Sequence, residues 1–187
     1  MLGDRGIDLR KEFNVLQNAF SMDILYVRAT RYIRCRCFSP LYNSGDASCP
    51  VCFGNGHLSS IEKIRGIQTK PSSASSSNKL RITDVGAVSQ SIEQFFLDYQ
   101  IRPKSRDIII VVGWDKDGRP ADVKRVYEIS GINEVRGDDG RVEFYDASVK
   151  MKPDLLGQVR TTIQRLPLKA KRILAERKRY VWPAQKS

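Results

Sequence analysis

The sequence has little of what enzymes use. It contains a single histidine, His57, so a Ser-His-Asp or Cys-His triad would depend on that residue alone, and no nucleophile elbow surrounds it. It has no phosphate-binding loop of the G-x-x-x-x-G-K-[ST] kind. Acidic residues such as Asp115 and Asp138 stand in turn-forming segments, where aspartate is favoured for backbone reasons. We therefore expect a protein that is not an enzyme.

Long hydrophobic runs are also missing. The longest strongly apolar run, 108–112, is far shorter than the roughly 20 residues that cross a bilayer. The first six residues lead into a charged stretch without the apolar core of a secretory signal. With 41% hydrophobic and 28% charged residues, the composition is typical of a soluble globular chain. We expect a protein of the cytoplasm, of one domain or two small ones, without a membrane partner.

The positive charge is concentrated at one end. Lysine and arginine number 32 against 21 acidic residues, a net charge of +11. Residues 151–187 hold ten basic and two acidic residues, a local +8 that leaves +3 for residues 1–150. A basic segment of this kind neutralises nucleic-acid phosphates, docks on an acidic protein, or is simply a solvated terminus. The candidate binding residues are Lys169, Lys171, Arg172, Arg177, Lys178 and Arg179.

Cysteine is absent outside one short stretch, where four residues follow the pattern C-x-C, eleven residues, C-P-x-C. They are Cys35, Cys37, Cys49 and Cys52. In a reducing compartment clustered cysteines indicate metal binding or redox chemistry rather than disulfides. Residues i and i+2 of an extended segment share a face, and two intervening residues let the chain turn so that both sulfurs of the second pair face one point.

This spacing predicts one structural Zn²⁺ held by four thiolates, which leave no open position for catalysis. Two alternatives stay open. The cluster could be a redox switch that ejects its metal, or His57 could replace one cysteine as a ligand.

The periodicity predicts a mostly β chain of the α+β class. Residues 8–20 are expected to form an amphipathic helix capped by Asp8, with Leu9, Phe13, Leu16 and Phe20 on one face. Strands are expected at 23–28, 80–85, 107–112, 123–129 and 142–149, with turns at 115–118 and 137–140. Residues 61–69 alternate like a strand, with a helical turn as the alternative, and 91–97 is either a strand or a helical turn. The continuously apolar strand at 107–112 should be covered on both faces.

These elements suggest four segments. Residues 1–70 would hold the helix, a strand and a zinc-ribbon-like knuckle, and 71–78, rich in serine, would be a linker. Residues 79–153 would form a small antiparallel β-barrel. Residues 154–187 would be a basic arm with helices at 155–166 and 169–180; because Ile173 and Leu174 are the only strong apolar anchors of the second helix, we expect the arm to be ordered only against a partner.

The sequence resembles two kinds of protein. Cys49-Pro50-Val51-Cys52-Phe53-Gly54-Asn55-Gly56 is similar to the zinc repeats of DnaJ-type chaperones, but over eight residues only. A longer stretch, about 8–150, resembles a zinc-bearing structural protein of large contractile-tailed bacteriophages. The residues that carry this resemblance are 23–28, Arg34-Cys35-Arg36-Cys37, 49–57, 106–111, 127–129 and 136–145.

The phage resemblance implies a head-closure or neck subunit of the virion, assembled in the host cytoplasm. Such a subunit would form a homo-oligomeric ring between portal and tail, in contact with other virion subunits. The basic arm could face packaged DNA or an acidic portal surface. The alternatives are a baseplate or tail component and a zinc-ribbon nucleic-acid-binding protein that uses the basic arm.

Overall fold

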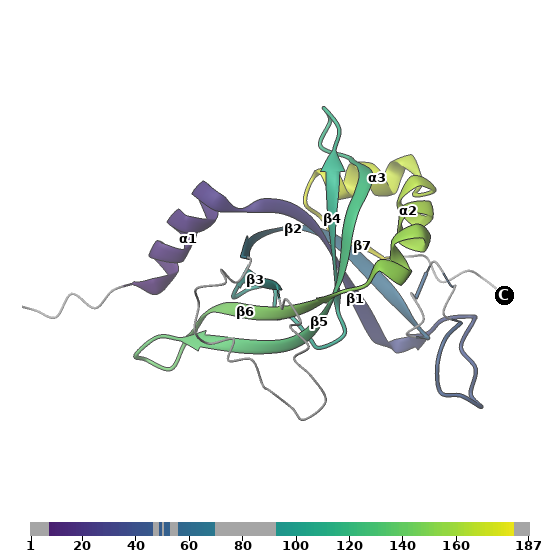
Figure 1. The fold of residues 1–187 in the computed structure, drawn as a ribbon, viewed down its shortest axis with the longest axis horizontal. Helices are drawn as coiled ribbons and strands as arrows, with labels where there is room; N and C mark the ends of the chain where they lie inside the picture. The colour runs from purple at the N-terminus through teal and green to yellow at the C-terminus, as the bar shows by residue number, and fades with distance from the viewer. Residues whose placement is uncertain (1–7, 47–48, 50, 53–55, 70–92, 182–187) are drawn as a thin grey trace, which may run out of the picture.

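A computed structural model describes residues 8–46, 49, 51–52, 56–69 and 93–181 (Figure 1). The expected linker at 71–78 and strand at 80–85 lie outside them. The elements are α1 (Leu9–Phe20), β1 (Met22–Arg34), β2 (His57–Thr69), β3 (Glu93–Asp98), β4 (Ile108–Trp114), β5 (Pro120–Arg136), β6 (Val142–Met151), η1 (Pro153–Leu155), α2 (Leu156–Gln164), α3 (Leu168–Ala175) and β7 (Tyr180–Val181). The expected helix at 8–20 is confirmed, and the described part of 91–97, residues 93–97, lies in strand β3.

Six strands close into an antiparallel barrel. They neighbour one another in the order β1-β4-β5-β6-β3-β2, and pairing between β1 and β2 completes the circle. The mostly β class, the N-terminal helix and the small antiparallel barrel predicted from the sequence are confirmed. The barrel is not confined to 79–153, however, because it takes β1 and β2 from the segment that we expected to stand apart.

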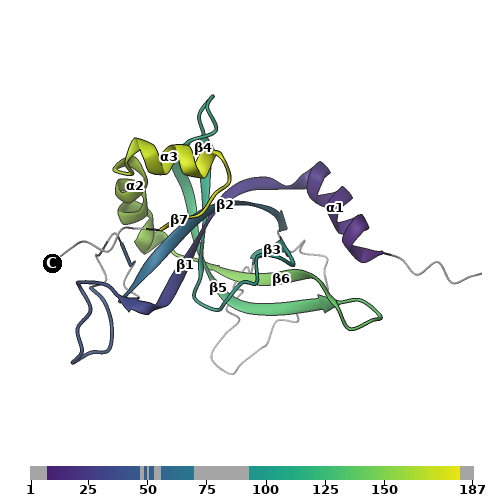
Figure 2. The ribbon, with the colours of Figure 1, turned by 180° about the vertical axis from the view of Figure 1, so that it is seen from behind.

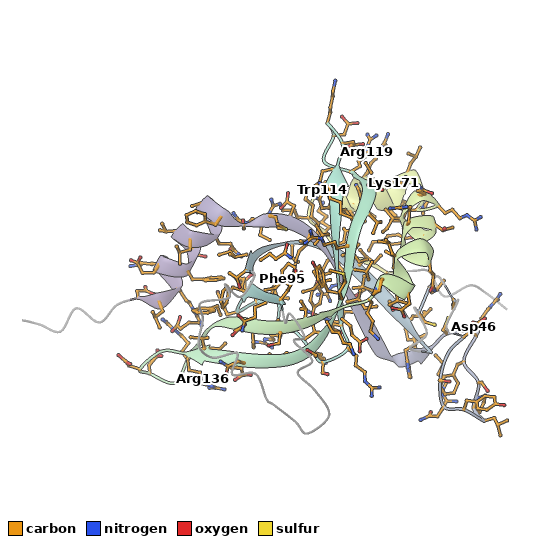
Figure 3. The ribbon with its side chains drawn as sticks, viewed as in Figure 1. Asp46, Phe95, Trp114, Arg119, Arg136 and Lys171 are labelled. Carbon is orange, nitrogen blue, oxygen red and sulfur yellow. The ribbon has the colours of Figure 1, made fainter. Side chains whose placement is uncertain are left out.

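The barrel is a packed core. Its interior is filled by large side chains from all six strands, with Phe95 near the centre (Figure 3). On β6 the buried residues alternate, as expected of a strand with one face inward. The buried interior residues are Ile24, Tyr26, Ile64, Phe95, Leu97, Ile109, Tyr127, Ile129, Tyr145, Ala147 and Val149.

A second core lies outside the barrel, between its strands and the C-terminal helices. Ile108, Ile110 and Val112 face outward from β4 into this layer, whereas Ile109 points into the barrel, so the strand is covered on both faces as predicted. Helices α2 and α3 and the connection between them supply Val159, Ile163, Leu166, Ala170 and Leu174, all buried. Both views show these helices against one side of the barrel (Figures 1 and 2).

The expectation that the C-terminal arm is ordered only against a partner is therefore wrong for residues 156–181. The apolar stripe runs through both helices and across Pro167, so each helix contributes two buried hydrophobic anchors to one shared surface and Leu166 adds one between them. The chain then returns to the barrel. Arg177 pairs with Asp23 at 2.8 Å, Arg179 pairs with Glu62 at 3.0 Å, and β7 pairs with β2.

Helix α1 contacts the barrel mainly through one face of its middle turns. Asp8 caps it by accepting a hydrogen bond from the backbone N–H of Lys11, as predicted. Phe13 stacks on Phe144 of β6 with ring centroids 4.7 Å apart, and Gln17 is also buried. In contrast, Leu16 and Phe20 of the expected apolar face stay largely exposed. None of the described helices has the length and apolar character needed to span a membrane.

Candidate metal centre

The four cysteines lie at the loop that connects β1 to β2. The last paired residues of the two strands are Arg34 and His57, and the backbone N–H of Cys35 donates to the carbonyl of Gly56 at 2.8 Å. The loop therefore begins and ends at one point of the hairpin. It projects from the end of the molecule opposite to α1, where Asp46 is labelled in Figure 3.

The structure brings all four predicted sulfurs together. Their Sγ atoms lie within 4.8 Å of one another, with 3.7 Å between Cys35 and Cys49 and 3.3 Å between Cys37 and Cys52. Each short distance joins one cysteine of the first pair to one of the second. The cluster therefore ties the two ends of the loop to each other and could hold one metal ion.

Backbone hydrogen bonds shape the loop around the sulfurs. The N–H of Phe38 donates to the carbonyl of Cys35 at 3.0 Å, which turns the chain directly after the first pair. Ser39 and Ser44 form a short bridge that closes the outer part of the loop. The N–H of Cys49 donates to the carbonyl of Asp46 at 3.0 Å and leads the chain into the second pair.

Two glycines let the loop close. A Cβ on Gly45 would stand 2.5 Å from the backbone nitrogen of Gly56 and 3.0 Å from the sulfur of Cys52. Gly56 has a φ of +72°, a left-handed conformation that side chains disfavour, and a Cβ there would lie 2.7 Å from the ring of Phe38. The backbone of the loop therefore passes close to itself and to the cluster at Gly45 and Gly56.

The cluster is partly enclosed. Cys35 and Cys52 are buried together with Leu58, whereas Cys37 and Cys49 are half-buried. Burial, and then the hydrogen bond between its thiol and Cys37, raise the pKa of the Cys52 thiol. Burial also raises the pKa of Cys37. At Cys49 burial opposes ionisation, but the N–H groups of Cys52 and Val51 outweigh it and lower the pKa.

These pKa shifts fit a site whose thiols lose their protons as they bind a cation. Four thiolates this close repel one another, and burial adds to the cost of ionising all of them. A bound divalent ion supplies the opposite charge and deprotonates coordinating thiols.

His57 is placed beside the cluster but is not grouped with it. Its ring lies against Phe38 with centroids 5.9 Å apart, and it is half-buried rather than a surface residue. Among the described residues, the group of possible metal ligands consists of the four cysteines. This arrangement favours the four-thiolate interpretation over replacement of a cysteine by the histidine.

One contact to the cluster could not be found from the sequence. Gln158 of α2 donates from Nε2 to the backbone carbonyl of Cys49 at 2.7 Å. The two residues are 109 positions apart, and nothing in either local pattern points to the other. The contact joins the second core to the cysteine loop.

The six basic candidates of the C-terminal segment have different surroundings. Arg177 and Arg179 pair with carboxylates of the barrel, and Lys178 pairs with Glu176 at 2.7 Å. Lys171 donates to the carbonyl of Gln164 at 3.2 Å. Lys169 and Arg172 are exposed on α3. The structure therefore does not gather all six on one open face, because Arg177 and Arg179 help to attach the segment to the barrel.

A scan against protein-family models and a search of curated proteins give no match to this chain.

Proposed function

We propose that the metal of the cysteine cluster is zinc and that its role is structural. A tetrahedral site with Zn–S bonds of about 2.3 Å places its sulfurs about 3.8 Å apart. The observed sulfur distances of 3.3 Å and 3.7 Å, with all four atoms within 4.8 Å, are close to that geometry. Four thiolates saturate the ion, so it fastens the loop and offers no position to a substrate.

We further propose that the protein is a non-enzymatic structural subunit of a tailed-phage virion, a neck or head-closure protein that forms a ring between portal and tail. The observation that carries this proposal is the loop between β1 and β2, which holds the four cysteines and is called the metal loop below. Both of its ends are anchored on a barrel with a packed interior. Eleven buried side chains of the described residues fill the interior of the barrel, as in small barrels that form a packed core. The loop is suited to hold a fixed shape against a neighbour.

The residues that would contact other subunits lie on the surface of this scaffold. Leu41 and Tyr42 at the outer part of the metal loop are 83% and 76% exposed. Phe20 on α1 is 70% exposed. Large apolar side chains on elements at both ends of one molecule favour a protein that binds neighbours on two sides.

Binding of DNA through the basic segment is a weaker alternative. Pairing of Arg177 and Arg179 with Asp23 and Glu62 uses two of the six candidate charges inside the molecule. Lys169 and Arg172 are exposed on α3, and the exposed Arg165 caps the C-terminal end of α2. Phosphate binding by these residues would lose affinity steeply with added salt, which separates it from an apolar contact between proteins.

The proposed function is tested in purified particles. We expect mass spectrometry of intact virions to detect the protein at a fixed copy number, and cryo-electron microscopy to locate its barrel as a ring at the neck. Density for the same barrel in the baseplate would favour the tail alternative. A protein that occurs only free in the lysate, with no density in particles, would refute a virion role.

A further inference from the structure

We infer that copies of this chain associate head to tail. The metal-loop tip, Leu41 and Tyr42, of one copy would sit in the apolar groove beside α1 of the next. This inference deepens the proposed function, on which it rests, by naming the contact that builds the ring. It follows from two apolar surfaces, a groove and a projecting loop tip, at opposite ends of the molecule.

The first surface is a groove between α1 and the barrel. Its volume is about 440 Å³, within the range of pockets that bind ligands and side chains. Phe13, Phe96 and Phe144 belong to its lining, as do Leu16 and Phe20 of α1 and Ile67 of β2. The groove exists because α1 meets the barrel through Phe13 and leaves Leu16 48% and Phe20 70% exposed.

The second surface is the tip of the metal loop. Leu41 and Tyr42 are adjacent in sequence and are among the most exposed large apolar residues of the described chain, at 83% and 76%. The Ser39–Ser44 bridge closes the backbone beneath them, and the cysteine cluster fastens both ends of the loop. The tip is therefore preorganised, which lowers the entropy cost of binding.

The positions of the two surfaces determine the kind of contact. Helix α1 and the metal loop lie at opposite ends of the long axis in both views (Figures 1 and 2). The tip cannot enter the groove of its own copy, so it must enter that of another. A contact between two different surfaces repeats from copy to copy and closes into a ring when the rotation allows it.

The charges at the two surfaces agree with this pairing. Glu12 is the only charged residue among the described residues that line the groove. At the base of the tip, the guanidinium of Arg34 lies over the ring of Phe38, 4.6 Å from its centroid. Docking the tip would bring the basic Arg34 toward the side of the molecule that carries Glu12, which favours this orientation of the two copies.

Photo-cross-linking tests the contact residue by residue. The full chain carries a benzophenone amino acid in place of Tyr42, with zinc bound, and is mixed with an isotopically labelled copy that lacks the probe. We expect adducts between the two copies that map to α1 or to Ile67, Phe96 and Phe144. Adducts confined to another segment, such as residues 182–187 or the loop of the second copy, would refute the inference. A sample that stays monomeric and gives no adduct would also refute it.

Two complementary variants provide a second test by sedimentation. We expect Tyr42→Asp and Phe20→Asp each to weaken self-association by about 30-fold or more, as charged substitutions at a contact centre do. A mixture of the two should form heterodimers, because each retains one intact surface. Leu168→Asp, at an apolar residue of α3 that is 68% exposed, is the matched control and should associate like the parent. Equal association of all variants, or a mixture without heterodimers, would overturn the head-to-tail contact.

Zinc content and thermal melting of each variant show whether it is folded. The two proposals fail separately. A protein absent from particles that still forms the cross-link refutes the virion role alone. A protein present at the neck whose Tyr42→Asp variant assembles normally refutes this contact alone.

Discussion

The side chain of Gln158 donates a hydrogen bond of 2.7 Å to the backbone carbonyl of Cys49. This bond joins α2, which packs on the outside of the barrel, to the second cysteine pair of the metal loop. Because Val159 next to it is completely buried, the position of Gln158 is determined by the second core. Loss of metal or substitution of a cysteine should therefore reduce the local stability of α2 more than that of the barrel interior.

Removal of the metal should loosen the loop and α2 without unfolding the barrel. We expect one zinc per chain, and chelation to cost about 2 kcal/mol or more, which lowers the melting temperature of a chain of this size by about 4–8 °C. Hydrogen exchange should rise in residues 35–46 and in α2, while β5 and β6 stay protected. Cys49→Ser should reproduce this effect and lose tight zinc binding.

His57→Gln is the matched control for the metal ligands, because His57 lies beside the cluster but is not grouped with it. It should keep one equivalent of zinc. A Cys49→Ser protein that still binds one zinc tightly, or a His57→Gln protein that loses it, would refute the four-thiolate site.

Gly56 should be far less tolerant of substitution than another glycine in the same backbone conformation. Gly56→Ala places a Cβ 2.7 Å from the ring of Phe38 and 2.9 Å from the backbone of Gly45, so we expect reduced zinc affinity and a loss of stability above 2 kcal/mol. Gly140 has a similar φ of +73° but open space around it, so Gly140→Ala should cost about 1 kcal/mol. Urea denaturation and zinc titration compare the two, and equal costs would contradict the steric argument.

Leu174 should be a core residue of the folded protein. It is completely buried in the second core, and Leu174→Ala should cost about 2–5 kcal/mol in the free energy of unfolding. Leu168→Ala, on the exposed side of the same helix, should change it by less than about 0.5 kcal/mol. Deletion from residue 168 onward should likewise destabilise the barrel. Unchanged melting of Leu174→Ala would show that α3 is not docked in solution.

This docking marks the limit of what the sequence could predict. The helix at 8–20, most of the strands, the turns at 115–118 and 137–140 and the cysteine cluster follow from local periodicity, capping and spacing, and these predictions were confirmed. The membership of β1 and β2 in the barrel rests on pairing with β4 and β3, which local patterns do not encode.

The C-terminal helices were misjudged for a related reason. Ile173 and Leu174 alone are too few to stabilise a helix, but Val159 and Ile163 of α2 share the same buried layer. The apolar residues on the two sides of Pro167 form one continuous surface in the folded protein, and the sequence alone does not show that the two helices pack on the same face of the barrel. The ion pairs of Arg177 and Arg179 span 154 and 117 positions, beyond any motif.

Asp146 should make stability depend on pH. Burial raises the pKa of its carboxyl. Oδ1 is buried and has no hydrogen-bond partner among the described residues, and Oδ2 accepts a long 3.4 Å hydrogen bond from Gln94. A carboxyl with a raised pKa in the folded state costs nothing below its unfolded pKa of about 3.9. The destabilisation grows as pH rises from there to the folded pKa, and it is complete above the folded pKa.

Asp146→Asn should therefore stabilise the protein at pH 7, by at most about 1 kcal/mol, and this gain should vanish below about pH 4. Thermal melts of both proteins from pH 3 to pH 8 measure the difference. Asp138→Asn, at an exposed turn residue, is the control, and its thermal stability should stay close to that of the parent at every pH. A stabilisation that is the same at all pH values would contradict the ionisation argument.

Asp23 should be required to attach the C-terminal segment. It pairs with the buried Lys63 at 3.1 Å and with Arg177 at 2.8 Å, and its backbone carbonyl accepts from Trp114 at 3.0 Å. Asp23→Asn leaves the Lys63 ammonium without its carboxylate, and we expect a cost of about 2–4 kcal/mol with faster proteolysis near residue 178. Asp117→Asn, which removes an exposed ion pair with Arg119, should cost less than about 1 kcal/mol. Equal effects would contradict the role of Asp23.

The stems of the cysteine loop, Arg34 and His57, already face each other as partners in the β1–β2 hairpin. The segment between them is thus an insertion into the β1–β2 hairpin, and a two-residue turn could also connect the two strands. Natural variation could lengthen, shorten or reshape this insertion while the scaffold below keeps its sequence. Proteins that share this barrel could in this way present different binding surfaces through the β1–β2 loop.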